Sequence, residues 1–364
     1  MSTTATISPT ATASAISATE TCTHPKPGKY GYLPPDACDA ILLYVPSFGA
    51  AILFTILFGL TFICHIVQAF IHKKKYAWVV IMGASWELLA FVFRTLQTRH
   101  QDSEAYATAH TLLYLLAPLW INAFIYMTLG RLIHFFIPDQ RLGGITAKRY
   151  GLVFVWLDIL AFLVQLAGAG ITTQNDLPNS TIMLGIHIYM GGIGLQELFV
   201  LIFGGLAIHL HRRMAQMENR GALDQEKTTR GSASWRWLFW AIYGSLTLIT
   251  IRIIFRLCQY ARGTDPSNPI LTHEAYEYVL DATPMFLALA ILNVVHPGRV
   301  LQGPDSEFPK VSRQEKKRIK QEKKEEKRAE RERKKNARRK NKEGPFESLS
   351  IQEEGQFYDS KVQC

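Results

Sequence analysis

Residues 42–71 read LLYVPSFGAAILFTILFGLTFICHIVQAFI, a stretch of 30 residues without a single Asp, Glu, Lys or Arg. A helix needs about 20 apolar residues to cross the roughly 30 Å hydrocarbon core of a bilayer, so this stretch is long enough to span it. Similar stretches recur, with short polar breaks, as far as Pro297. The arrangement of the 48% hydrophobic and 19% charged residues therefore predicts a membrane protein and argues against two soluble domains.

The hydrophobic pattern predicts an all-α membrane domain with seven transmembrane helices. The expected spans are Leu42–Ile71, Ala77–Gln97, His110–Phe136, Tyr150–Ile171, Ile182–His211, Trp237–Tyr260 and Tyr276–His296. The chain is accordingly divided into a Ser/Thr-rich segment at 1–40, the membrane domain at 41–298 and a charged tail at 299–364.

Lys and Arg are unevenly divided between the loops that join these spans. The first, third and fifth loops contain twelve of them, whereas the second, fourth and sixth contain two, Arg99 and Arg262. Cytoplasmic loops are enriched in Lys and Arg, so this asymmetry places the odd loops in the cytosol. With seven spans, the amino terminus is then expected outside the cell and the carboxyl terminus in the cytosol.

The segments predicted to lie outside contain candidate modification sites. Asn179-Ser180-Thr181 matches an N-glycosylation acceptor and falls in the predicted fourth loop, although a chance match too close to the bilayer is the alternative. The Ser/Thr-rich amino-terminal segment resembles an O-glycosylated stalk in composition. Cys22 and Cys38 both precede the first span, on the oxidising side, where they would either form a disulfide or remain separate thiols.

The basic character of the chain belongs to its tail. Residues Lys310–Lys342 hold 18 Lys and Arg against 6 Glu, a net charge of +12, whereas the whole chain carries +10. This does not indicate nucleic-acid binding in a seven-span protein. The run favours a solvated helix, with Glu330 and Lys334 as an attractive i,i+4 pair. In the cytosol it would either contact the anionic leaflet or serve only as a solubilising segment.

Polar residues recur within the predicted spans, where a buried charge is costly unless it finds a partner. We expect eight of them to face the bundle interior and to line a path for a lipid head group: Glu87, Arg94, Asp158, Gln165, Gln196, Arg252, Arg256 and Asp281. In this hypothesis the acids receive a ligand amine, and the arginines keep the acids ionised or contact phosphate. The alternative is a set of structural ion pairs that lock the helices together.

The direction of each span predicts the depth of these groups. The outer half is expected to hold a cluster of three cations and two anions, Arg94, Arg252, Arg256, Glu277 and Asp281. The middle and inner half is expected to hold three acids, Glu87, Asp158 and Glu197, with Arg131 as the nearest cation.

Motifs of enzymatic chemistry are missing from the sequence. It contains no H-E-x-x-H, G-x-S-x-G or phosphate-loop pattern. A zinc-dependent membrane hydrolase would need at least three His or Asp ligands at one depth, which the spans do not offer. We therefore expect no enzymatic activity, no cofactor and no metal site.

Several short patterns occur in a fixed order along the spans. They include Tyr44-x-Pro46-Ser47, the pair Glu87 and Arg94, Leu116-Ala117-Pro118, the pair Asp158 and Gln165, the pair Arg252 and Arg256, and HEAYEYVLDATPMFLALAILNVVHPGR at 273–299. With these patterns the chain resembles the fungal RTA-like family, also called the lipid-translocating exporter family, from about Tyr44 to Arg299. It departs from the family at Gln259, where a Glu is usual.

The resemblance implies export or flipping of amphipathic lipids such as sphingoid long-chain bases, and resistance to toxic amphiphiles. Membrane lipids are then the expected partners, with no nucleic acid, and protein partners are not indicated. The plasma membrane is the expected location, with the vacuolar or endoplasmic reticulum membrane as alternatives. A seven-helix lipid or stress sensor, without transport activity, is the competing interpretation.

Overall fold

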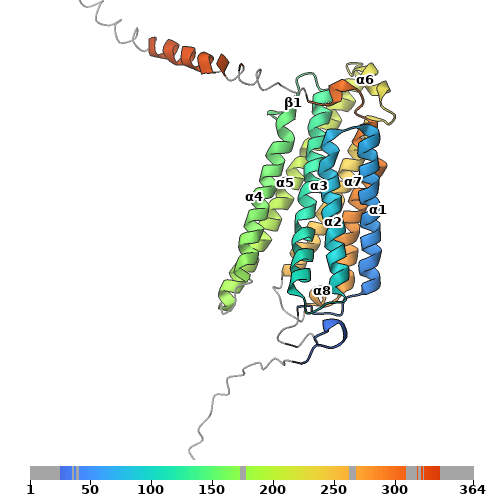
Figure 1. The fold of residues 1–364 in the computed structure, drawn as a ribbon. Helices are drawn as coiled ribbons and strands as arrows, with labels where there is room; N and C mark the ends of the chain where they lie inside the picture. Colours follow the sequence, from blue (N-terminus) through green and yellow to red (C-terminus); the bar gives the residue numbers. More distant parts are fainter. Residues whose placement is uncertain are drawn as a thin grey trace, which may run out of the picture. The chain divides into compact units, whose positions relative to one another are not determined.

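The computed structural model describes residues 25–34, 37, 41–172, 178–261 and 268–308, and in the tail residues 318, 321–322 and 324–336. The chain separates into two units, Met1–Glu307 and Phe308–Cys364. The first contains the helical bundle (Figure 1). The predicted Cys22–Cys38 disulfide lies outside the described residues.

Seven helical segments within the described residues are long and apolar enough to cross a membrane, which confirms the predicted seven-span fold. The first six contain α1 (Phe48–His72), α2 (Trp78–Gln97), α3 (Glu104–Phe136), α4 (Ala147–Thr172), α5 (Asn179–Asn219) and α7 (Trp235–Tyr260). The seventh consists of α9 (Glu274–Glu277), a π-helical turn (Tyr278–Ala282) and α10 (Thr283–Val294).

The connections contain short elements. They are α6 (Gln225–Arg230), α8 (Pro269–Thr272), and an antiparallel hairpin of β1 (Arg141–Leu142) and β2 (Ile145–Thr146), in which Arg141 pairs with Thr146. Single 3₁₀ turns lie at Lys29–Gly31, Lys75–Ala77, Pro297–Arg299 and Pro304–Ser306. The small hairpin departs from the all-α fold that the sequence predicts.

The ends of three helices differ from the sequence prediction. α1 begins at Phe48, after Ser47 accepts a hydrogen bond from the Ala50 amide at 3.3 Å, and α3 begins at Glu104, after the cap residue Ser103. α5 has 41 residues and runs from Asn179 to Asn219, so Asn179 is the exposed first residue of a helix and not a loop residue. At about 1.5 Å per residue α5 is roughly 60 Å long, well beyond the hydrocarbon core.

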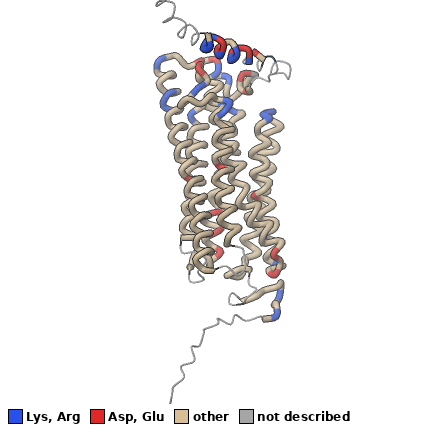
Figure 2. The backbone as a smooth tube through the Cα atoms, turned by 90° about the vertical axis from the view of Figure 1, so that its left-hand side faces the viewer, with Lys and Arg blue, Asp and Glu red and all other residues tan. Residues whose placement is uncertain are grey.

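Neighbouring spans pack largely in chain order, and α10 packs against both α7 and α1. α3 is the most buried span. We call the end where α1 begins the Tyr44 end, and the opposite end, where α1 gives way to α2, the Lys74 end. Figure 2 shows Lys and Arg gathered at the Lys74 end of the bundle, which agrees with the division of charge among the loops.

The segment after α10 folds across the Lys74 end. Leu301 and Ser306 are buried there, and Lys74 donates a hydrogen bond from Nζ to Ser306 Oγ at 2.5 Å. Burial lowers the pKa of the Lys74 ammonium, while nearby Glu307 acts in the opposite direction. Lys74 therefore helps to fix the chain that leads from the bundle to the tail.

Glycines let α4 and α5 approach closely. A Cβ atom added at Gly168 would lie 2.4 Å from the Tyr189 backbone nitrogen, and one added at Gly192 would lie 2.8 Å from the Gln165 backbone nitrogen. These distances leave no room for a side chain, so the two backbones are in direct contact, as small residues permit between membrane helices.

Gly192→Ala should therefore destabilise the protein, whereas the neighbouring Gly191→Ala should not. A Cβ at Gly192 meets backbone atoms of α4, but one at Gly191 has nothing within 4 Å. Overpacking of this kind costs about 1–3 kcal/mol. Thermal unfolding of the purified variants in detergent measures the difference, and equal midpoints for the two variants would contradict the close contact.

Candidate functional site

The structure places six of the eight predicted path residues in the buried interior and leaves Gln196 and Arg256 partly exposed. They fall into separate clusters instead of one continuous seam. We name these the Arg94 cluster (Tyr44, Arg94, Gln97, His110, Glu274 and Glu277), the Arg252 cluster (Glu87, Tyr114, Arg252, Arg256 and Asp281) and the Asp158 cluster (Asn122, Tyr126 and Asp158).

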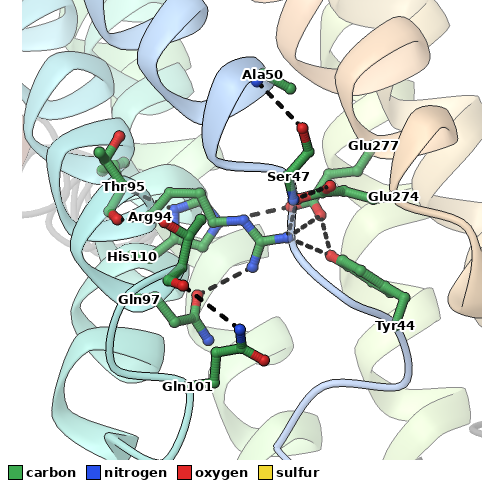
Figure 3. Close-up of polar contacts among 12 residues, drawn as sticks. Tyr44, Ser47, Ala50, Arg94, Thr95, Gln97, Gln101, His110, Glu274 and Glu277 are labelled. Carbon is green, nitrogen blue, oxygen red and sulfur yellow. Dashed lines mark hydrogen bonds and ion pairs between the residues drawn. The ribbon is translucent and has the colours of Figure 1, made fainter. Parts of the chain in front are cut away.

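The Arg94 cluster joins the start of the seventh span to α2 and α3 at the Tyr44 end (Figure 3). The Arg94 guanidinium lies 2.9 Å from Glu274 Oε1 and 3.7 Å from Glu277 Oε2, and it also donates to Gln97 at 3.0 Å. Its side chain is 3% exposed, so these partners replace water almost completely. Arg94 thus holds two carboxylates of α9 against α2.

The segment Tyr44–Ser47, which precedes α1, is bound into the same cluster, and we call it the strap. The Tyr44 hydroxyl donates to Glu277 Oε2 at 2.9 Å and accepts from Arg94. The Ser47 backbone amide donates to Glu274 Oε2 at 2.7 Å. Burial and the neighbouring Glu277 carboxylate raise the pKa of the Tyr44 phenol, so Tyr44 remains a donor at neutral pH.

The Arg252 cluster lies between α7 and the seventh span. Arg252 and Arg256, one helical turn apart, both form ion pairs with Asp281, which is fully buried. Arg252 also donates to the Tyr114 carbonyl at 2.9 Å. Glu87 on α2 is close enough to interact electrostatically with both arginines, but neither of its carboxylate oxygens has a hydrogen-bond partner among the described residues.

A π-helical turn presents Asp281 to the two arginines. Residues Tyr278–Ala282 form one widened turn, and both the backbone amide and the side-chain hydroxyl of Thr283 donate to the Tyr278 carbonyl. The hydroxyl bond, at 2.8 Å, supports the backbone where the regular helical pattern is interrupted. Such single π turns are found frequently at functional sites.

The Asp158 cluster lies between α3 and α4. Asp158 is 2% exposed, and its Oδ2 accepts hydrogen bonds from Asn122 at 3.1 Å and from Tyr126 at 3.0 Å. Its Oδ1 has no hydrogen-bond partner, and the Asn122 side-chain oxygen has none either, among the described residues. Both observed partners of this carboxylate are uncharged.

Polar groups of α5 lie beside this cluster. Gln165 of α4 donates to Gln196 of α5 at 3.0 Å, and Glu197 accepts from Thr250 of α7 at 2.9 Å through one carboxylate oxygen. The other carboxylate oxygen of Glu197 has no partner among the described residues. Glu197 also interacts electrostatically with Tyr126, which places it near the Asp158 cluster.

Two expectations on pairing need correction. The predicted outer cluster is divided, because Arg94 pairs with Glu277 whereas Arg252 and Arg256 pair with Asp281. Arg131 is not placed as the cation for the mid-membrane acids. Its guanidinium lies 3.6 Å from the centre of the Tyr76 ring and donates to the Met127 carbonyl at 3.1 Å, toward the Lys74 end.

The prediction of the path also missed five members of the Arg94 cluster: Tyr44, Gln97, His110, Glu274 and Glu277, the last of which was expected only in the outer charge cluster. Tyr44 and Glu274 were already present in the patterns that carry the family resemblance, so these patterns offered a signal. His110 gave none, because a single histidine at the start of a span is common. Among the described residues, no group of three His, Cys, Asp or Glu side chains is placed to hold a metal ion.

Comparison with known proteins assigns the chain to a family. Residues 80–304 match the family model described as RTA1 like protein, which covers α2 to the end of the seventh span. The chain belongs to the RTA1-like family. This confirms the resemblance inferred from the sequence. No solved structure matches this RTA1-like protein.

Three curated relatives illustrate the range of similarity. The chain is 61% identical to the "Probable lipid transporter atnI" of Emericella nidulans, over 85% of this chain and 81% of the relative. It is 26% identical to the "Lipid-translocating exporter-like protein RTA1" of Leptosphaeria maculans, over 72% and 52%. It is 24% identical to the "Sphingoid long-chain base transporter RSB1" of Saccharomyces cerevisiae, over 73% and 75%.

Asp281→Asn should strongly destabilise this RTA1-like protein. The substitution leaves Arg252 and Arg256 buried without the carboxylate that both contact. Breaking a buried ion pair from one side costs about 3–5 kcal/mol.

The control is Glu218→Gln, which breaks the exposed pair with Arg236 at 2.7 Å. Surface pairs contribute less than about 1 kcal/mol, so this variant should unfold close to wild type. Thermal unfolding in detergent compares the two, and a small effect of Asp281→Asn would show that the cluster contributes little to the fold.

Proposed function

We propose that this RTA1-like protein translocates amphipathic lipids whose head group carries an amine, sphingoid long-chain bases among them. The observation that carries the proposal is Asp158, a buried carboxylate held by two neutral donors and left with one unpartnered oxygen. A buried carboxylate is stable as an anion only with a counter-charge. The ammonium group of a long-chain base supplies a charge of the right sign.

The acids near α4 and α5 differ from those near the arginines in whether they have a charged partner. Glu274, Glu277 and Asp281 form ion pairs with arginines. Asp158 and Glu197 form none with the residues that the structure describes, and Asn122, Tyr126 and Thr250 are their neutral partners. The names of the relatives in Emericella and Saccharomyces, a lipid transporter and a sphingoid long-chain base transporter, support the same reading.

The head group would move along polar groups at successive depths of α4 and α5. Gln165 lies two helical turns from Asp158, or about 10 Å along the axis, and its bond to Gln196 bridges the two helices. The arginine clusters complete the predicted path, in which arginines keep the acids ionised. A phosphate could contact them only after their present ion pairs open.

We further propose that the Tyr44 end faces the outside of the cell and the Lys74 end faces the cytosol. Within the membrane domain, the loops and helix ends at the Lys74 end carry most of the Lys and Arg, including Lys73, Lys74, Lys75, Arg212 and Arg213. This agrees with the enrichment of positive charge in cytoplasmic loops. Asn179, exposed at the start of α5, would then be accessible for N-glycosylation.

The charged tail fits a role at the inner leaflet. Within the charge run, the described residues 318, 321–322 and 324–336 are helical and exposed, and Glu330 pairs with Lys334 at 2.7 Å, as the sequence predicts. Each basic residue close to an anionic surface contributes about 1 kcal/mol. We propose that the tail contacts anionic lipids of the cytosolic leaflet, that the protein resides in the plasma membrane, and that export of toxic amphiphiles confers resistance to them.

Asp158→Asn should reduce transport of a fluorescent long-chain base in reconstituted vesicles by at least about tenfold, because a charge-assisted hydrogen bond contributes about 1.5–3 kcal/mol. An N-acylated analogue, which has no charged amine, should be transported poorly by wild type and no worse by the variant. The control Asp139→Asn removes an exposed carboxylate that pairs with Arg213 and should leave transport unchanged.

Two results would contradict the proposal. If Asp158→Asn transports the base at the wild-type rate, Asp158 does not bind the amine. If wild type binds the base without moving it between leaflets, the protein is a lipid sensor and not a transporter.

The orientation is tested with single cysteines in a background where the native cysteines are replaced. Ser180→Cys, at the start of α5, should react with a membrane-impermeant maleimide on intact cells. Gln225→Cys, exposed on α6 at the opposite end, should react only after permeabilisation. The reverse pattern would invert the proposed topology.

A further inference from the structure

His110 lies between two groups that can only accept hydrogen bonds. Its Nδ1 is 3.0 Å from the Ala90 carbonyl oxygen of α2. Its Nε2 is 3.5 Å from Glu277 Oε1 of α9, and Figure 3 shows His110 beside Glu277. A carbonyl oxygen has no proton to give, so Nδ1 carries a hydrogen. In a neutral imidazole Nε2 would then present a lone pair to the Glu277 carboxyl group, and two lone pairs repel.

We propose that His110 and Glu277 bind one proton between them, and that this proton holds the strap closed at the Tyr44 end. The proton lies on His110 Nε2, which donates it to Glu277 Oε1, and it converts a repulsive contact into a hydrogen bond. His110 and Glu277 are not among the eight residues of the proposed lipid path, so each proposal can fail without the other.

The charges of the Arg94 cluster agree with one bound proton. Arg94 contributes one positive charge, and Glu274 and Glu277 contribute two negative charges. A proton on the His110–Glu277 pair brings the sum to zero, the favourable value in a site where Arg94 is 3% and His110 is 6% exposed. Loss of that proton leaves a net negative charge within the Arg94 cluster, next to the strap, which Arg256 of the Arg252 cluster opposes from a neighbouring position.

The other groups that face the pair do not exchange this proton near neutral pH. Arg94 and Arg256 are arginines, which stay protonated in proteins, and both act on Glu277. Tyr44 donates to Glu277, and burial raises the pKa of its phenol. Glu274 is ion-paired with Arg94 and accepts from the Ser47 amide. The proton is therefore assigned to the contact between His110 and Glu277.

Release of the proton acts on the strap through Glu277. Glu277 Oε2 accepts from Tyr44, and its ion pair with Arg94 positions the guanidinium that also contacts Tyr44. Repulsion between His110 Nε2 and the carboxylate displaces Glu277 from this position. The strap then loses its anchor at Tyr44, while the bond from Ser47 to Glu274 remains as its other attachment.

Accessibility of the strap as a function of pH tests the proposal. Pro46 is buried and Val45 is 62% exposed. A single cysteine at position 46 therefore reacts only when the strap opens, and one at position 45 serves as the exposed reference. The full-length protein, with native cysteines replaced, is studied in lipid nanodiscs with a soluble maleimide. The ratio of the Pro46→Cys rate to the Val45→Cys rate cancels the pH dependence of the thiol itself.

The ratio should be low at acidic pH and should rise by about tenfold as the pH increases and one proton is lost. Tenfold is the factor that corresponds to loss of one charge-assisted hydrogen bond. His110→Gln provides the matched variant, because its amide can donate to Glu277 without titrating. In this background the ratio should stay low at every pH. A pH-dependent rise that persists in His110→Gln, or a wild-type ratio that does not change, would overturn the proposal.

A second measurement does not depend on cysteines. Histidine ring resonances of ¹³C,¹⁵N-labelled protein distinguish neutral tautomers from the doubly protonated ring, and His110→Gln identifies the His110 signal by its loss. The signal should titrate over the same pH range as the accessibility ratio, and Glu277→Gln should shift that range. A His110 ring that keeps a neutral tautomer with hydrogen on Nδ1 alone, at all pH values where the strap is closed, would refute the shared proton.

Discussion

The structure depends on how charge is accommodated in a medium that solvates it poorly. Three arginines of α2 and α7 lie in the bundle, and each contacts a carboxylate of the last span. Removing one partner from such a pair leaves the other buried and uncompensated, at a cost of about 3–5 kcal/mol. The arginines therefore determine where the last span can lie, and the strap is bound to the same carboxylates.

The other side of the bundle is built differently. α4 and α5 are held together by backbone contact at Gly168 and Gly192, and the acids near them are solvated by amides and hydroxyls. In the arginine clusters, arginines neutralise the carboxylates. Around Asp158, the partners of the carboxylate are uncharged and do not neutralise it. This contrast explains why we assign cation binding to α4 and α5 rather than to the arginine clusters.

Much of the fold was predictable, because hydropathy reports directly on spans of the length a bilayer requires. The burial of Glu87, Asp158 and Asp281 was predictable too, since a charge within a span must turn inward. The ion-pair and hydrogen-bond partners of these residues were not predictable. Depth alone grouped Arg94 with Arg252 and assigned Arg131 to the central acids, but pairing depends on which helices are neighbours and how each is rotated. His110 was overlooked because its role comes from Ala90 and Glu277, neither of which is near it in sequence.

The widened turn at Tyr278–Ala282 has a mechanical consequence. It stores one surplus residue within the last span, and such a defect can migrate along a helix as hydrogen bonds exchange partners. Moving it past Asp281 would rotate that residue by about 100°, the angle per residue of an α-helix. The carboxylate would swing away from Arg252 and Arg256 while the helix stayed helical on either side. A shift of this turn would therefore separate the last span from the arginines of α7 by rotation, with no need to move the span out of the bilayer.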